Sequence, residues 1–117
     1  MGSFLLFLFS CKESSNIKMI ESHFIYEKPP FIECHASSIE ELSDGNIVIA
    51  AFGGTKEKNK DVTIWLSKKE ADKWQSPKLI ADGIINDTLR YPTWNPVLYR
   101  TMSDVLYLYY KVGPSPR

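Results

Sequence analysis

Hydrophobic and polar positions alternate in the same way in two stretches of the chain, residues 36–52 and residues 96–110. Each stretch has two apolar arms joined by a polar turn, a pattern that predicts a β-hairpin. A shift of fifty-nine positions superimposes hydrophobic residues: Ile39 on Leu98, Ile47 on Leu106 and Ile49 on Leu108. An internal repeat of this length indicates a modular all-β protein, and a chain of 117 residues holds about two such units.

The residues between the two stretches predict further strands. The first hairpin turns at residues 43–46, Ser-Asp-Gly-Asn, which have the chemistry of a tight turn. The arm at residues 46–52 is apolar on both faces, as in a strand buried inside a stacked or radial assembly. Additional strands are expected at three places: residues 61–67, residues 78–81 and, more briefly, residues 23–27 before Pro29 and Pro30. Residues 67–73 carry only a faint helical period.

Four short antiparallel strands between residues 36 and 81 match one blade of a β-propeller, and the hairpin at residues 94–112 begins the next. The predicted fold class is therefore all-β, with roughly the first one and a half to two blades of a propeller. Four or more blades usually close a propeller, so the expected partners include the remaining blades, which are absent from this chain.

Charge and composition exclude several functions. Fourteen basic residues balance fourteen acidic ones, and the basic residues are scattered, which argues against nucleic acid as a partner. The only close set of basic residues, Lys56, Lys58 and Lys60, alternates with Glu57 and Asp61 and is interpreted as a solvated loop. The sequence has no metal-ligand cluster, phosphate-binding glycine loop or serine triad, so no metal and no cofactor are expected.

The first eleven residues contain an apolar run that ends at Ser10 and Cys11 and precedes a polar stretch. This resembles the end of a bacterial lipoprotein signal, with Cys11 as the lipidated residue, although no basic residue precedes Phe4. The predicted organisation is a signal at 1–11, a tether at 12–22 and a partial propeller at 23–117. The protein would then be exported to the periplasm or outer membrane and meet the membrane only through its lipid. The alternative is a buried N-terminal strand.

With lipid on Cys11, Cys34 has no partner and a disulfide framework is excluded. Cys34 is then a small hydrophobe. A nucleophilic Cys34 with His35 as its base is disfavoured, because neighbouring residues of a strand point to opposite faces.

Five strings in residues 34–114 resemble the sialidase-like β-propeller family, specifically the neuraminidase-related group with BNR or Asp-box repeats. They are Cys-His-Ala-Ser-Ser-Ile at 34–39, Phe-Gly-Gly-Thr-Lys-Glu at 52–57, Asp-Val-Thr-Ile-Trp at 61–65, Trp-Asn-Pro-Val-Leu at 94–98 and Tyr-Lys-Val-Gly-Pro at 110–114. Ser67 and Trp74 have the spacing of an Asp box, with Lys69 and Ala71 where Asp and Gly are usual. The resemblance implies that this box is a turn and that Trp74 packs between blades.

The resemblance also shows where this chain departs from true sialidases, which hold the substrate carboxylate with three arginines. His35 stands where the first of these arginines is expected, and Lys56 lies near the second. Neither residue reproduces the two-pronged contact of an arginine with a carboxylate. The expected partner is therefore a glycan or oligosaccharide, with sialic acid itself doubtful.

The candidate site follows from propeller geometry. In each blade, the start of the first strand and the loop after the second strand lie near the central channel of the propeller. The resemblance implies an acid/base carboxyl in the loop at residues 55–61, so Asp61 is the first candidate for general acid or base and Glu57 the second, with His35 as base or hydrogen-bond partner. The alternative for Asp61 is a turn residue. Four further residues are expected to bind substrate: Lys56, Trp94, Asn95 and Lys111. Trp94 is alternatively a space-filling residue between blades, and Lys111 a snorkelling side chain.

Three functions remain open from the sequence. The first is a glycan-active hydrolase or lyase, of which these 117 residues would be an inactive, marginally folded fragment. The second is a non-catalytic carbohydrate-binding lipoprotein on the same fold. The third is an unrelated small β-domain.

Overall fold

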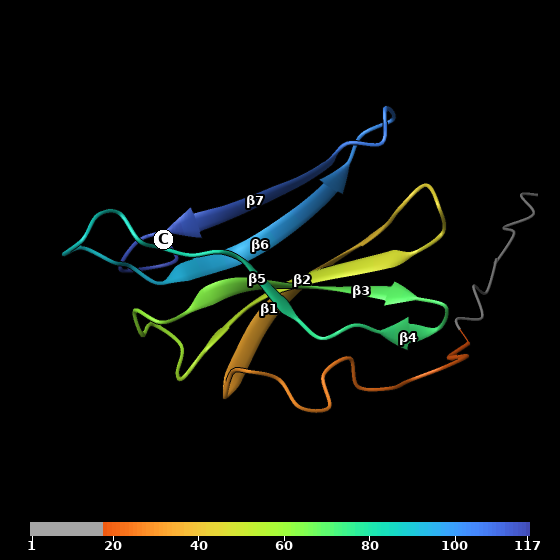
Figure 1. Ribbon diagram of the computed structural model, residues 1–117, viewed down its shortest axis with the longest axis horizontal. Coiled ribbons are helices and arrows are strands. Elements are labelled where there is room, and N and C mark those ends of the chain that lie inside the picture. Colours follow the sequence, from red (N-terminus) through yellow and green to blue (C-terminus); the bar gives the residue numbers. More distant parts are fainter. Residues whose placement is uncertain (1–17) are drawn as a thin grey trace, which may run out of the picture.

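The structure is a computed structural model that describes residues 18–117, and within this range it contains seven strands and no helix (Figure 1). The strands are β1 (Glu33–Glu41), β2 (Ile47–Gly54), β3 (Thr63–Glu70), β4 (Lys73–Trp74), β5 (Lys78–Ala81), β6 (Thr93–Arg100) and β7 (Leu106–Val112). The all-β prediction is confirmed. The segment with Cys11 lies outside the described residues. Between residues 18 and 117 there is no helix with the length and apolar character needed to cross a membrane.

The strands form two antiparallel sheets. In the first sheet, β1 pairs with β2 and β2 with β3, while β4 and β5 both pair with β3. The fourth strand of the expected blade is thus divided into two pieces. The second sheet is the hairpin of β6 and β7. The predicted hairpins and the strand at residues 78–81 are all present.

The two hairpins repeat one another in backbone detail at the predicted spacing. The β1–β2 register shifts between His35 and Ser38, and the β6–β7 register shifts between Trp94 and Val97. Inside each bulge one residue adopts a positive φ, 47° at Ala36 and 43° at its equivalent. The repeat in hydrophobic positions is therefore a repeat of the fold.

The tight turns of the two hairpins are equivalent as well. Gly45 has a φ of 78° in the first turn, and Asp104, fifty-nine positions later, has a φ of 64° in the second. The amide of Gly45 donates to the carbonyl of Leu42 at 3.0 Å, and the amide of Asp104 donates to the carbonyl of Thr101 at 3.0 Å. Glycine occupies the left-handed conformation at little steric cost, whereas Asp is one of the few other residues that tolerate it.

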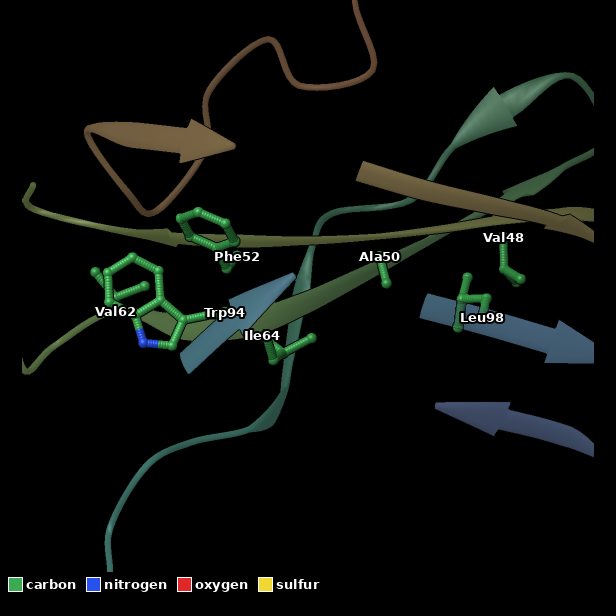
Figure 2. Packing of buried hydrophobic residues seen from close by; sticks show 7 residues of the cluster. All are labelled: Val48, Ala50, Phe52, Val62, Ile64, Trp94 and Leu98. Carbon is green, nitrogen blue, oxygen red and sulfur yellow. The ribbon is translucent and has the colours of Figure 1, made fainter. Parts of the chain in front are cut away.

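The core lies between the two sheets, where side chains of β2 and β3 meet those of β6. Figure 2 shows the cluster, in which Trp94 and Leu98 of β6 face the first sheet. The other members are Val48, Ala50, Phe52, Val62 and Ile64. Trp94 packs edge-on against Phe52, with ring centroids 5.9 Å apart. One face of β2 is buried in this core, and most residues on its other face are buried as well. This explains why β2 is apolar on both faces.

The predicted strand at residues 23–27 is wrong, because this segment forms no ladder. Its Tyr26 ring packs against Phe31, and Phe31 packs in turn against Trp65 of β3, both pairs with centroids 5.3 Å apart. Pro29 and Pro30 follow and lack the amide protons that a ladder requires. Side-chain packing therefore replaces backbone pairing here.

The end of the third strand also differs from the prediction. β3 continues to Glu70, so the faint helical period over residues 67–73 does not produce a helix. Ala71 and Asp72 then make a two-residue turn with φ values of 47° and 63°, the geometry of tight hairpins. The degenerate Asp box therefore does occupy the turn between the third and fourth strands.

Candidate functional site

The antiparallel topology brings several chain segments to one end of the two sheets. β1 and β6 begin at this end, while β2 and β7 finish there, as the pairing of His35 with Phe52 and of Trp94 with Lys111 requires. The loop between β2 and β3 lies at the same end (Figure 1). The candidate residues therefore come from segments that the fold gathers together.

A hollow of about 590 Å³ opens at this end between the start of β1 and the β2–β3 loop. Its volume falls within the range of about 300–1,000 Å³ that is usual for ligand pockets. The lining residues are Ile32, Glu33, Cys34, His35, Lys56, Glu57 and Lys58. Three of the predicted site residues, His35, Lys56 and Glu57, thus line one hollow.

Glu33 connects the two walls of this hollow. Its Oε2 atom accepts a hydrogen bond from the backbone amide of Glu57 at 2.9 Å and lies 3.8 Å from Nε2 of His35. Glu33 and His35 are two residues apart on β1, which places their side chains on the same side of the strand. The sequence analysis missed Glu33, although its i, i+2 spacing from His35 was a usable signal.

His35 is supported from below by an aromatic contact. Its ring lies 5.7 Å from the ring of Phe52, which in turn packs against Trp94. The ring of His35 therefore rests on the core while its polar edge remains exposed at the hollow. This arrangement gives the imidazole a defined position beside the Glu33 carboxylate.

Asp61 does not line the hollow and instead closes the base of the β2–β3 loop. Its carboxylate accepts hydrogen bonds from the backbone amide of Thr55 at 2.9 Å and from the Thr55 hydroxyl at 3.0 Å. Burial raises the pKa of Asp61, but the hydrogen bonds from Thr55 and from the Asp61 backbone, together with the charge of Arg90, outweigh it, and the pKa lies below its usual range. An ionised carboxylate occupied by its own loop has the geometry of the turn residue that the sequence left as the alternative.

Trp94 and Asn95 lie at the start of β6 in different environments. Trp94 is 1% exposed, and its indole nitrogen donates to the carbonyl of Gly113 at 2.8 Å. Its ring faces therefore fill the space between the sheets, which leaves no free face for a sugar. Asn95 is exposed at the β6 bulge, and neither residue lines the hollow.

Lys111 pairs with Trp94 across the second hairpin and is exposed. Its Nζ atom donates to the carbonyl of Pro116 at 3.0 Å. The side chain therefore holds the segment that follows β7, and it is not among the residues around the hollow.

The Cys34 thiol is a free thiol at the edge of the hollow. The residue keeps exposed surface, yet the protein atoms around its sulfur desolvate the thiol and raise its pKa. A raised pKa lowers the fraction of thiolate, which is the reactive form. The environment of Cys34 accordingly favours the hydrophobe over the nucleophile.

Trp74 of the degenerate Asp box lies away from the hollow. Its indole nitrogen donates to Nε2 of His23 at 2.9 Å, so Trp74 contacts the segment before β1. The resemblance implied that Trp74 packs between blades, whereas in this structure it holds the N-terminal segment against the β3–β4 turn.

The hollow offers hydrogen-bonding and proton-transfer groups. His35 and the carboxyls of Glu33 and Glu57 can exchange protons, and Lys56 and Lys58 add positive charge. Over residues 18–117, no cluster of three or more His, Cys, Asp or Glu side chains has the geometry to hold a metal ion.

A family model described as a BNR repeat-like domain matches residues 45–117, more than half of the chain. The matched region begins in the first hairpin turn and includes β2 to β7, whereas β1 precedes it. No curated protein and no solved structure matches this chain.

Proposed function

Because the chain belongs to the family of BNR repeat-like domains, we propose that it acts on or binds a glycan through the hollow at the start of β1. The observation that carries this proposal is the convergence of His35, Glu33 and Glu57 in one hollow. Sugars present many hydroxyl groups, and this set of carboxylates, imidazole and ammonium groups supplies both acceptors and donors for them.

In a glycosidase role, Glu57 is the carboxyl that we assign to proton transfer in place of Asp61. Glu57 lines the hollow, whereas the carboxylate of Asp61 is used by Thr55. His35, held beside Glu33, would bind the substrate or act as the base. Arginines are absent from the lining, so we do not assign sialic acid as the substrate.

The second candidate function is a carbohydrate-binding protein without turnover. It is favoured by the shallowness of the hollow, because six of the seven lining residues are exposed and the seventh, Glu33, is only half-buried. Glycosidase chemistry depends on a general acid whose pKa is raised by an apolar environment. An open, hydrated hollow suits reversible binding better than protonation of a leaving group.

The proposal is tested by presenting the purified full chain to an array of neutral and acidic glycans. We expect His35→Ala to reduce retention of the bound glycan at least tenfold, and Lys60→Ala, in the same loop but outside the lining, to leave it unchanged. Glu57→Gln separates the two functions: turnover that disappears while binding persists favours the enzyme, and a parent that binds without turnover favours the binder. A chain that retains no glycan contradicts both.

We further propose that the protein is exported and anchored by lipid on Cys11, on the basis of the apolar run that precedes this residue. Metabolic labelling with a fatty acid tests this in a bacterial host. We expect label on the parent and none on Cys11→Ser, with Cys34→Ser as the matched control that keeps the label. An unlabelled parent refutes the anchor.

A further inference from the structure

The outer face of the second hairpin carries three exposed tyrosines and one exposed valine, here named the tyrosine face. Its members are Val97, Tyr99, Tyr107 and Tyr109. Cross-strand pairing places Val97 beside Tyr109 and Tyr99 beside Tyr107, and the rings of Tyr107 and Tyr109 stack with centroids 6.1 Å apart. Tyr109 is 59% exposed and Tyr99 55%. Contiguous apolar surface of this kind marks an interaction site.

The internal repeat of the two hairpins indicates which surface can pack against the tyrosine face. Shifting the tyrosine face back by fifty-nine positions gives Ser38, Glu40, Val48 and Ala50 of the first hairpin. Those residues form the face that β6 covers. Val48 and Ala50 lie in the core, Ser38 Oγ accepts from the amide of Leu98 at 2.9 Å, and Glu40 Oε2 accepts from the amide of Arg100 at 3.3 Å.

The covering surface in that interface is the opposite face of the second hairpin, which includes Trp94, Leu98 and Leu108. Its equivalent in the first hairpin consists of His35, Ile39 and Ile49. Ile39, the equivalent of the core residue Leu98, is 62% exposed and His35 is exposed as well, whereas Ile49 is buried, at 7%. The chain therefore displays, on different surfaces, the tyrosine face and the exposed part of the surface equivalent to its internal partner, here named the Ile39 face and formed by His35 and Ile39.

We propose that the tyrosine face of one copy binds the Ile39 face of a second copy, which continues the packing already present between the two hairpins. The second copy would supply the repeat that a propeller places on this face. Such a contact is heterologous, because two different surfaces meet. Four half-exposed side chains offer less area than the roughly 800 Å² per partner of a standard interface, so the association is expected to be concentration-dependent.

Sedimentation velocity of the full chain across a hundredfold range of concentration tests the proposal. We expect Tyr109→Arg to weaken association at least tenfold, which equals about 1.4 kcal/mol, since it places a charge at the centre of the tyrosine face. Tyr110→Arg is the matched control, because it makes the same substitution at the neighbouring position on the other side of β7. Circular dichroism of each variant checks that the sheets remain.

Mixing variants distinguishes this contact from others. Tyr109→Arg retains an intact Ile39 face, and Ile39→Arg retains an intact tyrosine face. Each variant alone should be monomeric, and an equimolar mixture should form a one-to-one pair that cannot extend. The apolar N-terminal residues are common to all variants, so any association that they cause is the same in each.

Three outcomes overturn the proposal. A parent that stays monomeric at every concentration shows that the tyrosine face does not take a second copy. Self-association of Ile39→Arg as strong as that of the parent shows that two tyrosine faces meet each other or that another surface is used. Failure of the mixture to pair, with both variants folded, excludes the heterologous contact. Because His35 also lines the hollow, glycan binding is measured separately by repeating the array with Tyr109→Arg, in which the residues of the hollow are unchanged.

Discussion

Replacing Trp94 tests whether the two sheets are joined as the structure describes. The side chain is 1% exposed, lies against Phe52 and donates a hydrogen bond to Gly113. Truncating a buried Trp to Ala typically costs about 3–5 kcal/mol, because transfer free energy is lost and a cavity remains. Domains of ordinary stability have about 5–15 kcal/mol in total, so Trp94→Ala is expected to leave much of the chain unfolded.

Trp94→Phe gives the more measurable change. It keeps an aromatic ring beside Phe52 but removes the indole donor, and the loss of one hydrogen bond costs about 0.5–1.5 kcal/mol. The smaller ring adds a cost for lost burial of about 1 kcal/mol, roughly that of one or two methylene groups. We therefore expect the free energy of unfolding to fall by about 2 kcal/mol.

The measurement is urea denaturation followed by circular dichroism, with the slope of the transition compared between variants. Trp74→Phe is the matched control, because its indole is only partly buried and bonds to His23 at the surface, and a loss below about 1 kcal/mol is expected. If both tryptophan variants lose the same small amount, Trp94 does not join the sheets and the core described here is wrong.

Three further predictions concern the backbone, the inter-sheet hydrogen bonds and pH. Gly83→Ala should destabilise the chain by more than about 2 kcal/mol, because its Cβ would clash with the carbonyl oxygen of Tyr91. Gly113→Ala is the control and should change stability little, because its Cβ would meet its nearest atom at 3.8 Å, and equal urea midpoints for the two variants would contradict the clash. Ser38→Ala should cost about 1 kcal/mol in the same assay by leaving the amide of Leu98 without its acceptor, and an equal loss from Ser37→Ala would show that the bond is not responsible. The stabilisation from the lowered pKa of Asp61 is present above about pH 4, the pKa of an unfolded Asp, and is lost as the pH falls through the folded pKa. The difference in unfolding free energy between the parent and Asp61→Asn should therefore shrink on acidification, and a difference independent of pH would refute the role of the Asp61 carboxylate in closing the loop.

The candidate site was predictable only in part from sequence. Family resemblance selected His35, Lys56 and Glu57, and the fold places these three around one hollow. It also selected Asp61, for which the structure shows hydrogen bonds to Thr55. A carboxylate within a short loop can point outward or fold back onto its own backbone, and residue type does not distinguish the two.

By itself, the sequence determined the strands, the turns and the repeat of the chain. These features depend on neighbouring residues: alternation of apolar positions, Asp-Gly at the first turn and the spacing between Ile39 and Leu98 all act locally. Tertiary structure alone decided that residues 23–27 pack through Tyr26 instead of joining a sheet, and that Glu33 connects β1 to the loop at Glu57. Contacts between residues distant in the sequence depend on how the sheets pack, and packing reflects the shape of the whole assembly.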